Sequence, residues 1–352
     1  MLDVKNIKIT PQMLAQIAEL DEYKGAWTGF SRLRPEQLKT LKKVATIESI
    51  GSSNRIEGNK LSDAEVEDFL SHIDKKSFKS RDEEEVAGYA EIMNIIFDNY
   101  SVIPLSENYI KQLHQILLKY VGKDKRHRGE YKKLSNTVAA YDEKGKEIGI
   151  VFETASPFDT PILMEELVEW TRKNLDDPLL HPLIVIGVFV VHFLAIHPFQ
   201  DGNGRLSRAL TAMLLLKKGY AYVPYSSIES IIEASKDGYY RALRRTQKNI
   251  HHGKVDYEPW LSFFLTTLQK QKKHLEGKIT AITGDDTKLS RNQRSILGLF
   301  DKKPKWTSAE VSAKLKMNIE TTKKGLQALT AYGYLVKQGT TKGAWYEREK
   351  TI

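Results

Sequence analysis

The chain has 352 residues, of which 41% are hydrophobic and 28% are charged, as in ordinary globular proteins. It contains no cysteine, which excludes disulfides and cysteine-based zinc sites and is compatible with a reducing compartment. The first residues show no signal peptide, and the longest apolar run, 184–196, is shorter than the roughly 20 residues that span a bilayer. We therefore expect a cytoplasmic protein with no membrane partner.

The net charge of +9 is concentrated at one end of the chain. Residues 287–352 contain 14 Lys and Arg against 5 Asp and Glu, whereas the first 286 residues contain 40 of each kind. A basic terminal module indicates nucleic acid or an acidic surface as a partner, and the body need not contact either. The length allows two or three domains, each with its own core.

Residues 1–120 are predicted to be helical. A helix is expected to begin at Pro35, to carry apolar residues at helical spacing, and to end near residue 58 with Gly58 as its C-cap. Further helices are expected between residues 62 and 120, the first of them capped by Ser62. We interpret these later helices as a scaffold.

The pattern changes between residues 128 and 157. Two short apolar runs, 138–141 and 148–152, flank a turn-like segment at 142–146. This arrangement predicts a β-hairpin within residues 134–156.

The most informative stretch is His197–Arg208, which reads His-Pro-Phe-Gln-Asp-Gly-Asn-Gly-Arg-Leu-Ser-Arg. It follows an apolar helical segment and leads into a second helix, so its polar residues lie on a tight loop and on the start of that helix. Gly202 and Gly204 allow the backbone N–H groups to turn toward one point, and the helix N-terminus adds further donors. The stretch therefore predicts an anion site.

The side chains of this stretch suit phosphoryl or nucleotidyl transfer. With a reference pKa of about 6.5, His197 can take a proton from an attacking hydroxyl. Asp201 offers an oxygen ligand for Mg²⁺, and Asn203 can donate to a phosphoryl oxygen. Arg205 and Arg208 are three residues apart on one helix face, so both can reach one phosphate chain.

The twelve residues match the signature of the Fic family, His-x-Phe-x-(Asp/Glu)-Gly-Asn-Gly-Arg-x-x-Arg, at every defined position. This resemblance implies a mainly α-helical Fic-type bundle with a small β-hairpin flap. It also implies a protein adenylyltransferase, or AMPylator, which moves AMP from ATP to a Ser, Thr or Tyr hydroxyl of a protein.

The resemblance also assigns roles to the matching residues. His197 corresponds to the general base, Asp201 to the ligand of Mg²⁺ on the α- and β-phosphates, and Phe199 to the anchor of the loop. The implied phosphate-binding residues are Gly202, Asn203 and Gly204 at the α-phosphate, and Arg205 and Arg208 at the β- and γ-phosphates.

The predicted helix over about 35–58 ends in Ser53-Asn54-Arg55-Ile56-Glu57-Gly58. This resembles the inhibitory motif (Ser/Thr)-x-x-x-Glu-(Gly/Asn) of one class of Fic proteins, and it implies that Glu57 pairs with Arg208 in place of the ATP γ-phosphate. A carboxylate binds the same guanidinium fork that binds phosphate, so the two compete. The alternative is a helix-terminal glutamate in solvent.

Two further segments resemble Fic elements. The hairpin over about 134–156 would be the flap, whose edge pairs with an extended segment of the target protein by strand addition; a hairpin that only covers the core is the alternative. Tyr239 and Tyr240, in Tyr-Tyr-x-x-Leu, resemble a segment near the adenine pocket, although aromatic residues on a helix also commonly belong to a core.

The basic end follows a linker-like segment, 283–287, and has its own pattern. Three short helices and a hairpin resemble a winged helix-turn-helix domain, with DNA or a protein as partner. The residues on its candidate recognition helix are Thr321, Thr322, Lys323 and Lys324. We therefore predict a helical region over 1–120, a Fic catalytic core over 121–283 and a winged helix-turn-helix domain over 287–352.

Two other functions are compatible with the sequence. The core could sense a nucleotide for a DNA-binding transcriptional regulator, although a sensor would not need the base at His197. The same site could also remove AMP from a protein by hydrolysis, with Glu57 orienting the attacking water.

Overall fold

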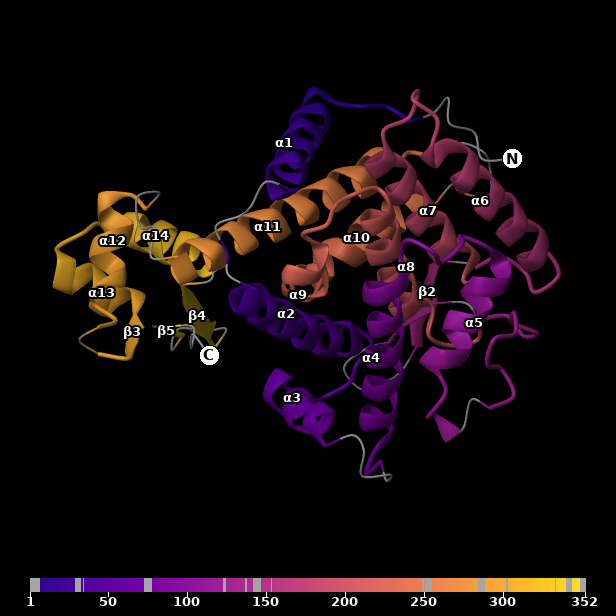
Figure 1. Ribbon diagram of the computed structural model, residues 1–352, viewed down its shortest axis with the longest axis horizontal. Coiled ribbons are helices and arrows are strands. Elements are labelled where there is room, and N and C mark those ends of the chain that lie inside the picture. The colour runs from indigo at the N-terminus through magenta and orange to yellow at the C-terminus, as the bar shows by residue number, and fades with distance from the viewer. Residues whose placement is uncertain are drawn as a thin grey trace.

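The computed structural model describes residues 7–28, 33, 35–72, 78–122, 125–136, 138–141, 147–152, 154–248, 250, 255–283, 289–301, 303–332, 334–339 and 344–348. These residues are mainly helical (Figure 1). None of the helices in this part of the chain is both long and apolar enough to cross a membrane. Before residue 284 the helices are α1 (Pro11–Thr28), α2 (Pro35–Ile56), α3 (Asp63–Ser71), α4 (Arg81–Asn99), α5 (Glu107–Leu117), α6 (Thr160–Leu175), α7 (Pro182–Ile196), α8 (Asn203–Lys217), α9 (Ile228–Ala234), α10 (Lys236–Gln247) and α11 (Glu258–Thr283), with a short 3₁₀ helix, η3 (Val223–Tyr225).

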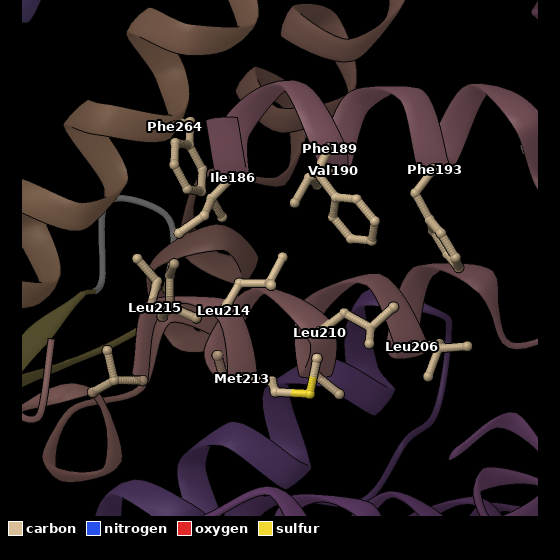
Figure 2. Packing of buried hydrophobic residues seen from close by; sticks show 14 of the residues in the cluster. Ile186, Phe189, Val190, Phe193, Leu206, Leu210, Met213, Leu214, Leu215 and Phe264 are labelled. Atoms are coloured by element: carbon tan, nitrogen blue, oxygen red, sulfur yellow. The ribbon is translucent and has the colours of Figure 1, made fainter. Parts of the chain in front are cut away.

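The centre of the body is the pair α7 and α8. Almost every side chain of α7 is apolar and buried, because α6, α8, α10 and α11 all pack against it. Figure 2 shows Ile186, Phe189 and Phe193 of α7 directed toward the leucines of α8. This buried contact fixes the two helix ends between which the predicted anion site lies.

Helix α2 begins at Pro35 and ends at Ile56, as the sequence predicts. Gly58 follows with a φ of 100°, a left-handed conformation that glycine adopts without strain. Arg55 fixes this end, because it donates to Glu233 of α9 at 2.7 and 3.0 Å and to Asp63 of α3 at 2.8 Å. The position of residue 57 is thereby tied to two neighbouring helices.

The predicted hairpin is present as β1 (Val138–Tyr141) and β2 (Glu147–Phe152), which pair antiparallel with two irregularities in register. The predicted turn, 142–146, lies outside the described residues. The capping box predicted at Ser62 is confirmed, since Ser62 and Glu65 bond reciprocally at the start of α3.

The C-terminal part has its own hydrophobic cluster, built from residues 289–346. Its elements are α12 (Arg291–Leu297), β3 (Lys305–Thr307), α13 (Ser308–Leu315), α14 (Ile319–Ala331), β4 (Leu335–Gln338) and β5 (Trp345–Arg348), with an antiparallel sheet in the order β3-β5-β4. The sequence predicts the three helices and the β4–β5 hairpin but not β3. This part packs on α11 (Figure 1), where a side chain at Gly277 would collide with the backbone of Tyr332.

Gly88 permits the close crossing of α4 and α5, because a Cβ there would collide with the carbonyl oxygen of Leu117. We expect Gly88→Ala to lower the free energy of unfolding by about 1–3 kcal/mol, since the obstructing atom is main chain and cannot rotate away. Urea denaturation measures this change. Gly25→Ala in α1 is the matched control: its Cβ would meet no atom within 4 Å, and we expect a gain of about 0.5–1 kcal/mol. Equal stabilities for the two variants would contradict this account of the crossing.

Candidate active site

His197 lies at the end of α7 in a left-handed conformation, with φ 52° and ψ 60°. Its N–H donates to the carbonyl of Phe193 at 2.9 Å, and its Nδ1 lies 3.2 Å from the carbonyl oxygen of Leu194. Because a carbonyl oxygen only accepts, Nδ1 carries the hydrogen, and in the neutral ring the lone pair is on Nε2. This tautomer is the one that a general base at this position needs.

Burial, helped by the nearby Lys132 ammonium, lowers the pKa of His197 to about 4, against the opposing effects of the bond to the Leu194 carbonyl and of Glu57 and Asp201. The ring is therefore neutral at pH 7 and able to accept a proton.

The loop after His197 is closed by Asn203. Its Oδ1 accepts from the N–H of Phe199 at 2.9 Å, and its Nδ2 donates to the carbonyl of Phe199 at 2.7 Å. Gly202 has a φ of 79°, which explains the glycine there. Asn203 thus shapes the loop in this structure, and within the described part of the chain Nδ2 uses one of its two hydrogens for this bond.

Phe199 is buried, as predicted for the anchor of the loop, and it stacks on His114 with ring centroids 3.8 Å apart. His114 is fully buried on α5, where Nδ1 accepts from the N–H of Gly129 at 3.0 Å and Nε2 donates to the carbonyl of Asp201 at 3.0 Å. Sequence reasoning missed this residue. In the sequence His114 is marked only by its spacing from the other buried positions of α5, and this spacing does not distinguish a histidine of the site from one of the core.

The structure brings the predicted inhibitory residues to Arg208. Its Nε donates to Ser53 Oγ at 2.9 Å, and its Nη2 donates to the Ser53 carbonyl and to Glu57 Oε1, each at 2.8 Å. Arg208 is only 3% exposed, whereas the Glu57 side chain is 34% exposed. Burial alone would lower the pKa of Arg208, but the Glu57 carboxylate outweighs it and raises this pKa.

Glu57 also lies against the first turn of α8. A Cβ on Gly204 would collide with Glu57 Oε1, so the glycine leaves the space that the carboxylate fills. An anion is favoured there, because the first turn of a helix presents N–H groups and the positive end of the helix dipole. The predicted anion site therefore holds a carboxylate of the same chain.

Arg205 is directed to a different carboxylate pair. It is 2% exposed, with Nη1 3.2 Å from Glu85 and Nη2 3.5 Å from Asp201. Arg81, at the start of α4, also binds both acids, at 2.8 Å from Glu85 and 3.1 Å from Asp201. Arg205 and Arg208, the two arginines predicted to bind phosphate, thus lie on one helix face but bind different carboxylates in this structure. Arg81 and Glu85 are site residues that sequence reasoning missed.

Asp201 is the predicted ligand of Mg²⁺. Its side chain is 40% exposed, with Oδ1 accepting from the N–H of Gly202 at 2.6 Å. The described residues contain no group of three or more metal-binding side chains. Because Mg²⁺ usually combines one or two carboxylates with substrate phosphates and water, a single accessible carboxylate beside an anion site fits Mg²⁺ that arrives with a nucleotide.

The two tyrosines of α10 differ in burial. Tyr239 is a core residue, packed against Trp260 with centroids 5.8 Å apart, and Tyr240 is half-buried. Arg208, Tyr239 and Trp260 line a small cavity of about 20 Å³. This space holds about one water molecule and no nucleobase, so the adenine role of both tyrosines stays a prediction.

Comparison with known proteins places these residues in context. Residues 104–215 match the model of the Fic/DOC family. The protein adenylyltransferase Fic of Drosophila willistoni is 27% identical over 259 residues, covering 72% of this chain and 46% of that protein. That of Drosophila melanogaster is 28% identical over 237 residues, covering 66% and 42%. The chain therefore spans less than half the length of these relatives.

Solved structures give the same result for the fold. A Fic family protein from Desulfovibrio desulfuricans G20 aligns with a TM-score of 0.59 and 21% identity, covering 99% of this chain and 98% of that one. A Fic domain containing signaling protein from Bacteroides thetaiotaomicron aligns with a TM-score of 0.60 and 25% identity, covering 76% and 97%. The first of these likenesses extends over the C-terminal part as well as the body.

His114 predicts a dependence of stability on pH. Burial lowers its pKa to about 4, whereas a histidine in the unfolded chain titrates near 6.5, so only the unfolded chain binds this proton between these values. Stability therefore falls as the pH drops below about 6.5, and His114 accounts for about 2 kcal/mol between pH 7.5 and pH 5. We expect His114→Gln to show a smaller loss in urea denaturation, and His72→Gln, at an exposed position, to match the wild type. An unchanged pH dependence in His114→Gln would argue against this role.

Proposed function

Because residues 104–215 of this chain match the model of the Fic/DOC family, we propose that the protein is a Mg²⁺-dependent protein adenylyltransferase. It would move AMP from ATP to a Ser, Thr or Tyr hydroxyl of a protein. The observation that carries the proposal is the geometry at the ends of α7 and α8, where the neutral His197, the accessible Asp201 and the buried Arg208 surround one anion site. The fly relatives bear the name of this activity.

In this proposal His197 Nε2 takes the proton of the target hydroxyl. The hydroxyl oxygen bonds to the α-phosphorus of ATP while the bond to the leaving pyrophosphate breaks, so the products are an AMP ester and pyrophosphate. The N–H groups at the start of α8 and the Arg208 guanidinium stabilise the phosphate charge. Asp201 would hold Mg²⁺, which supplies further charge neutralisation when it is bound.

The target would dock on the β1–β2 hairpin. An exposed strand edge accepts an extended segment through main-chain hydrogen bonds, which is a sequence-tolerant way to present a side-chain hydroxyl. The contact of Asn136, which precedes the hairpin, with the His197 loop supports this proposal.

We also propose that Glu57 inhibits the enzyme. It binds the Arg208 fork that would bind the γ-phosphate, and Nη1 of Arg208 is buried without a hydrogen-bond partner among the described residues. A nucleotide that enters beside Glu57 can still bind, but with its α-phosphate turned away from in-line attack.

Glu57→Gly tests the activity and the inhibition together. We expect this variant, incubated with Mg²⁺ and ATP, to acquire an AMP adduct at least tenfold faster than the wild type, because Arg208 becomes available to phosphate. Intact-mass analysis measures the adduct, and label on the α-phosphate of ATP identifies it. Glu57→Gln tests whether the negative charge is required, and Glu36→Gly, at the exposed start of α2, is the matched control.

Adding His197→Ala to Glu57→Gly should abolish the adduct while nucleotide binding persists. A folded double variant with full transfer would remove His197 from the role of base. If neither the wild type nor Glu57→Gly forms an adduct but an AMP-modified substrate is hydrolysed, the same site removes AMP, and the direction of the proposed reaction is wrong.

For the C-terminal part we propose a winged helix-turn-helix module that binds DNA. The specific observation is α14, which presents Thr321, Lys323 and Lys324 at exposed positions, while Thr322 is buried and donates to the Asn318 carbonyl at 3.0 Å. All four predicted residues lie on α14, but Thr322 faces the module's own core and does not contribute to the exposed surface. A protein partner is the alternative for this surface.

The double variant Lys323→Glu/Lys324→Glu tests the DNA proposal. We expect at least tenfold weaker binding to duplex DNA and a salt dependence reduced by about two phosphate contacts. Fluorescence anisotropy at several salt concentrations measures both. Lys39→Glu/Lys173→Glu, which changes the same charge at exposed positions of the body, should bind as the wild type does. Equal affinities for both pairs would favour a protein partner.

A further inference from the structure

Two residues that precede the flap hold the main chain of the catalytic loop. The Lys132 ammonium donates to the carbonyl of Ile196 at 2.8 Å, and the Lys132 N–H donates to the carbonyl of Pro198, also at 2.8 Å. Asn136 Nδ2 donates to the carbonyls of His197 at 3.2 Å and Phe199 at 2.6 Å. Four consecutive carbonyl groups, residues 196–199, are thus bound by two residues.

The same two residues also bind the segment that follows the flap. Lys132 Nζ donates to Thr154 Oγ1 at 3.0 Å, and Thr154 Oγ1 donates to Asn136 Oδ1 at 2.9 Å. The N–H of Ala155 then donates to the carbonyl of Ala195 at 3.3 Å. Both ends of the hairpin are therefore fastened to the end of α7, next to His197.

A lysine is unusual in this role because it is charged and buried. Lys132 is 3% exposed, its ammonium donates to three neutral oxygen atoms, and burial lowers its pKa to about 8. A buried ammonium costs free energy unless its donors are satisfied. His197 needs such support, because a residue other than glycine in the left-handed region is strained by about 1–3 kcal/mol.

We propose that Lys132 and Asn136 are positioning residues that fix the position of His197 relative to the β1–β2 hairpin. A target hydroxyl presented by the hairpin would then arrive at a fixed distance from His197 Nε2. Displacing a reacting group by about 1 Å can cost roughly 100-fold in rate, so this fastening matters for the transfer step. The inference rests on the proposed function and adds two residues to it.

The nucleotide is expected to bind through other groups, namely Arg208, the first turn of α8 and Asp201. Among the described residues, the hydrogen bonds of Lys132 and Asn136 go to none of these side chains. Their loss should therefore reduce transfer without reducing affinity for ATP. A general loss of structure would reduce both.

The test uses the full chain with Glu57→Gly, so that transfer is measurable, and adds Lys132→Met or Asn136→Ala. We expect a 30- to 100-fold lower kcat for AMP transfer, with the Kd for ATP unchanged within threefold. The acid limb of the pH profile should move to higher pH in Lys132→Met, since the ammonium lowers the pKa of His197. Lys133→Met, at the exposed neighbouring lysine, is the matched control and should behave as the parent does.

Lys132→Arg keeps a cationic donor and should recover part of the rate, which also covers the case that Lys132→Met does not fold. Unchanged kcat in both Lys132→Met and Asn136→Ala, or an equal loss of kcat and ATP affinity, would overturn the inference.

A second readout does not depend on activity. The imidazole NMR signals of His197, assigned with His197→Ala, should shift and broaden in Lys132→Met and Asn136→Ala, while those of the distant His181 on the α1 side stay unchanged. If the Glu57→Gly parent transfers no AMP, the proposed function fails, and this measurement still decides the positioning role. Unaltered His197 signals would overturn it.

Discussion

The buried charge of Arg208 is the constraint on which the site depends. A guanidinium that is 3% exposed needs an anion or oxygen acceptors, because desolvation without a partner costs several kcal/mol. Ser53 and Glu57 meet this need in the resting structure. In the proposed mechanism a γ-phosphate would reach Arg208 only by replacing Glu57 there, so productive substrate binding and inhibition would be two states of one ion pair.

Arg205, the other buried arginine of the site, is also neutralised by carboxylates, here next to the predicted Mg²⁺ ligand Asp201. Arg205 and Arg81 are shared between Glu85 and Asp201, so the charges of this group of four cancel. Asp201 is therefore held by cations before any metal arrives. Mg²⁺ would compete with Arg81 for the exposed oxygen, and the phosphates it accompanies would offer that arginine a new partner.

The sequence predicts the site well where its chemistry is local. The residues of 197–208 are adjacent in the chain, and α2 is periodic with clear ends, so these elements follow from spacing and capping. His114, Arg81, Lys132 and Asn136 were missed because each acts across 60 to 120 positions of the chain. Nothing in their local pattern distinguishes them from scaffold, and only the packing of α4 and α5 on α8 brings the first two to the loop.

If Glu57 inhibits as proposed, its release requires a rotation of its side chain rather than a movement of α2. Helix α2 is fixed at its end by Arg55, which binds both Glu233 and Asp63, and in its middle by Glu48, which accepts from the buried Lys278 of α11 at 2.7 Å. Moving the helix would break these contacts together. Glu57 itself lies beyond the last turn, is 34% exposed and precedes a glycine, so among the described residues a rotation of its side chain breaks only the hydrogen bond to Arg208. In the proposed mechanism the cost of activation would then be set by one ion pair, for which the γ-phosphate of ATP would compete.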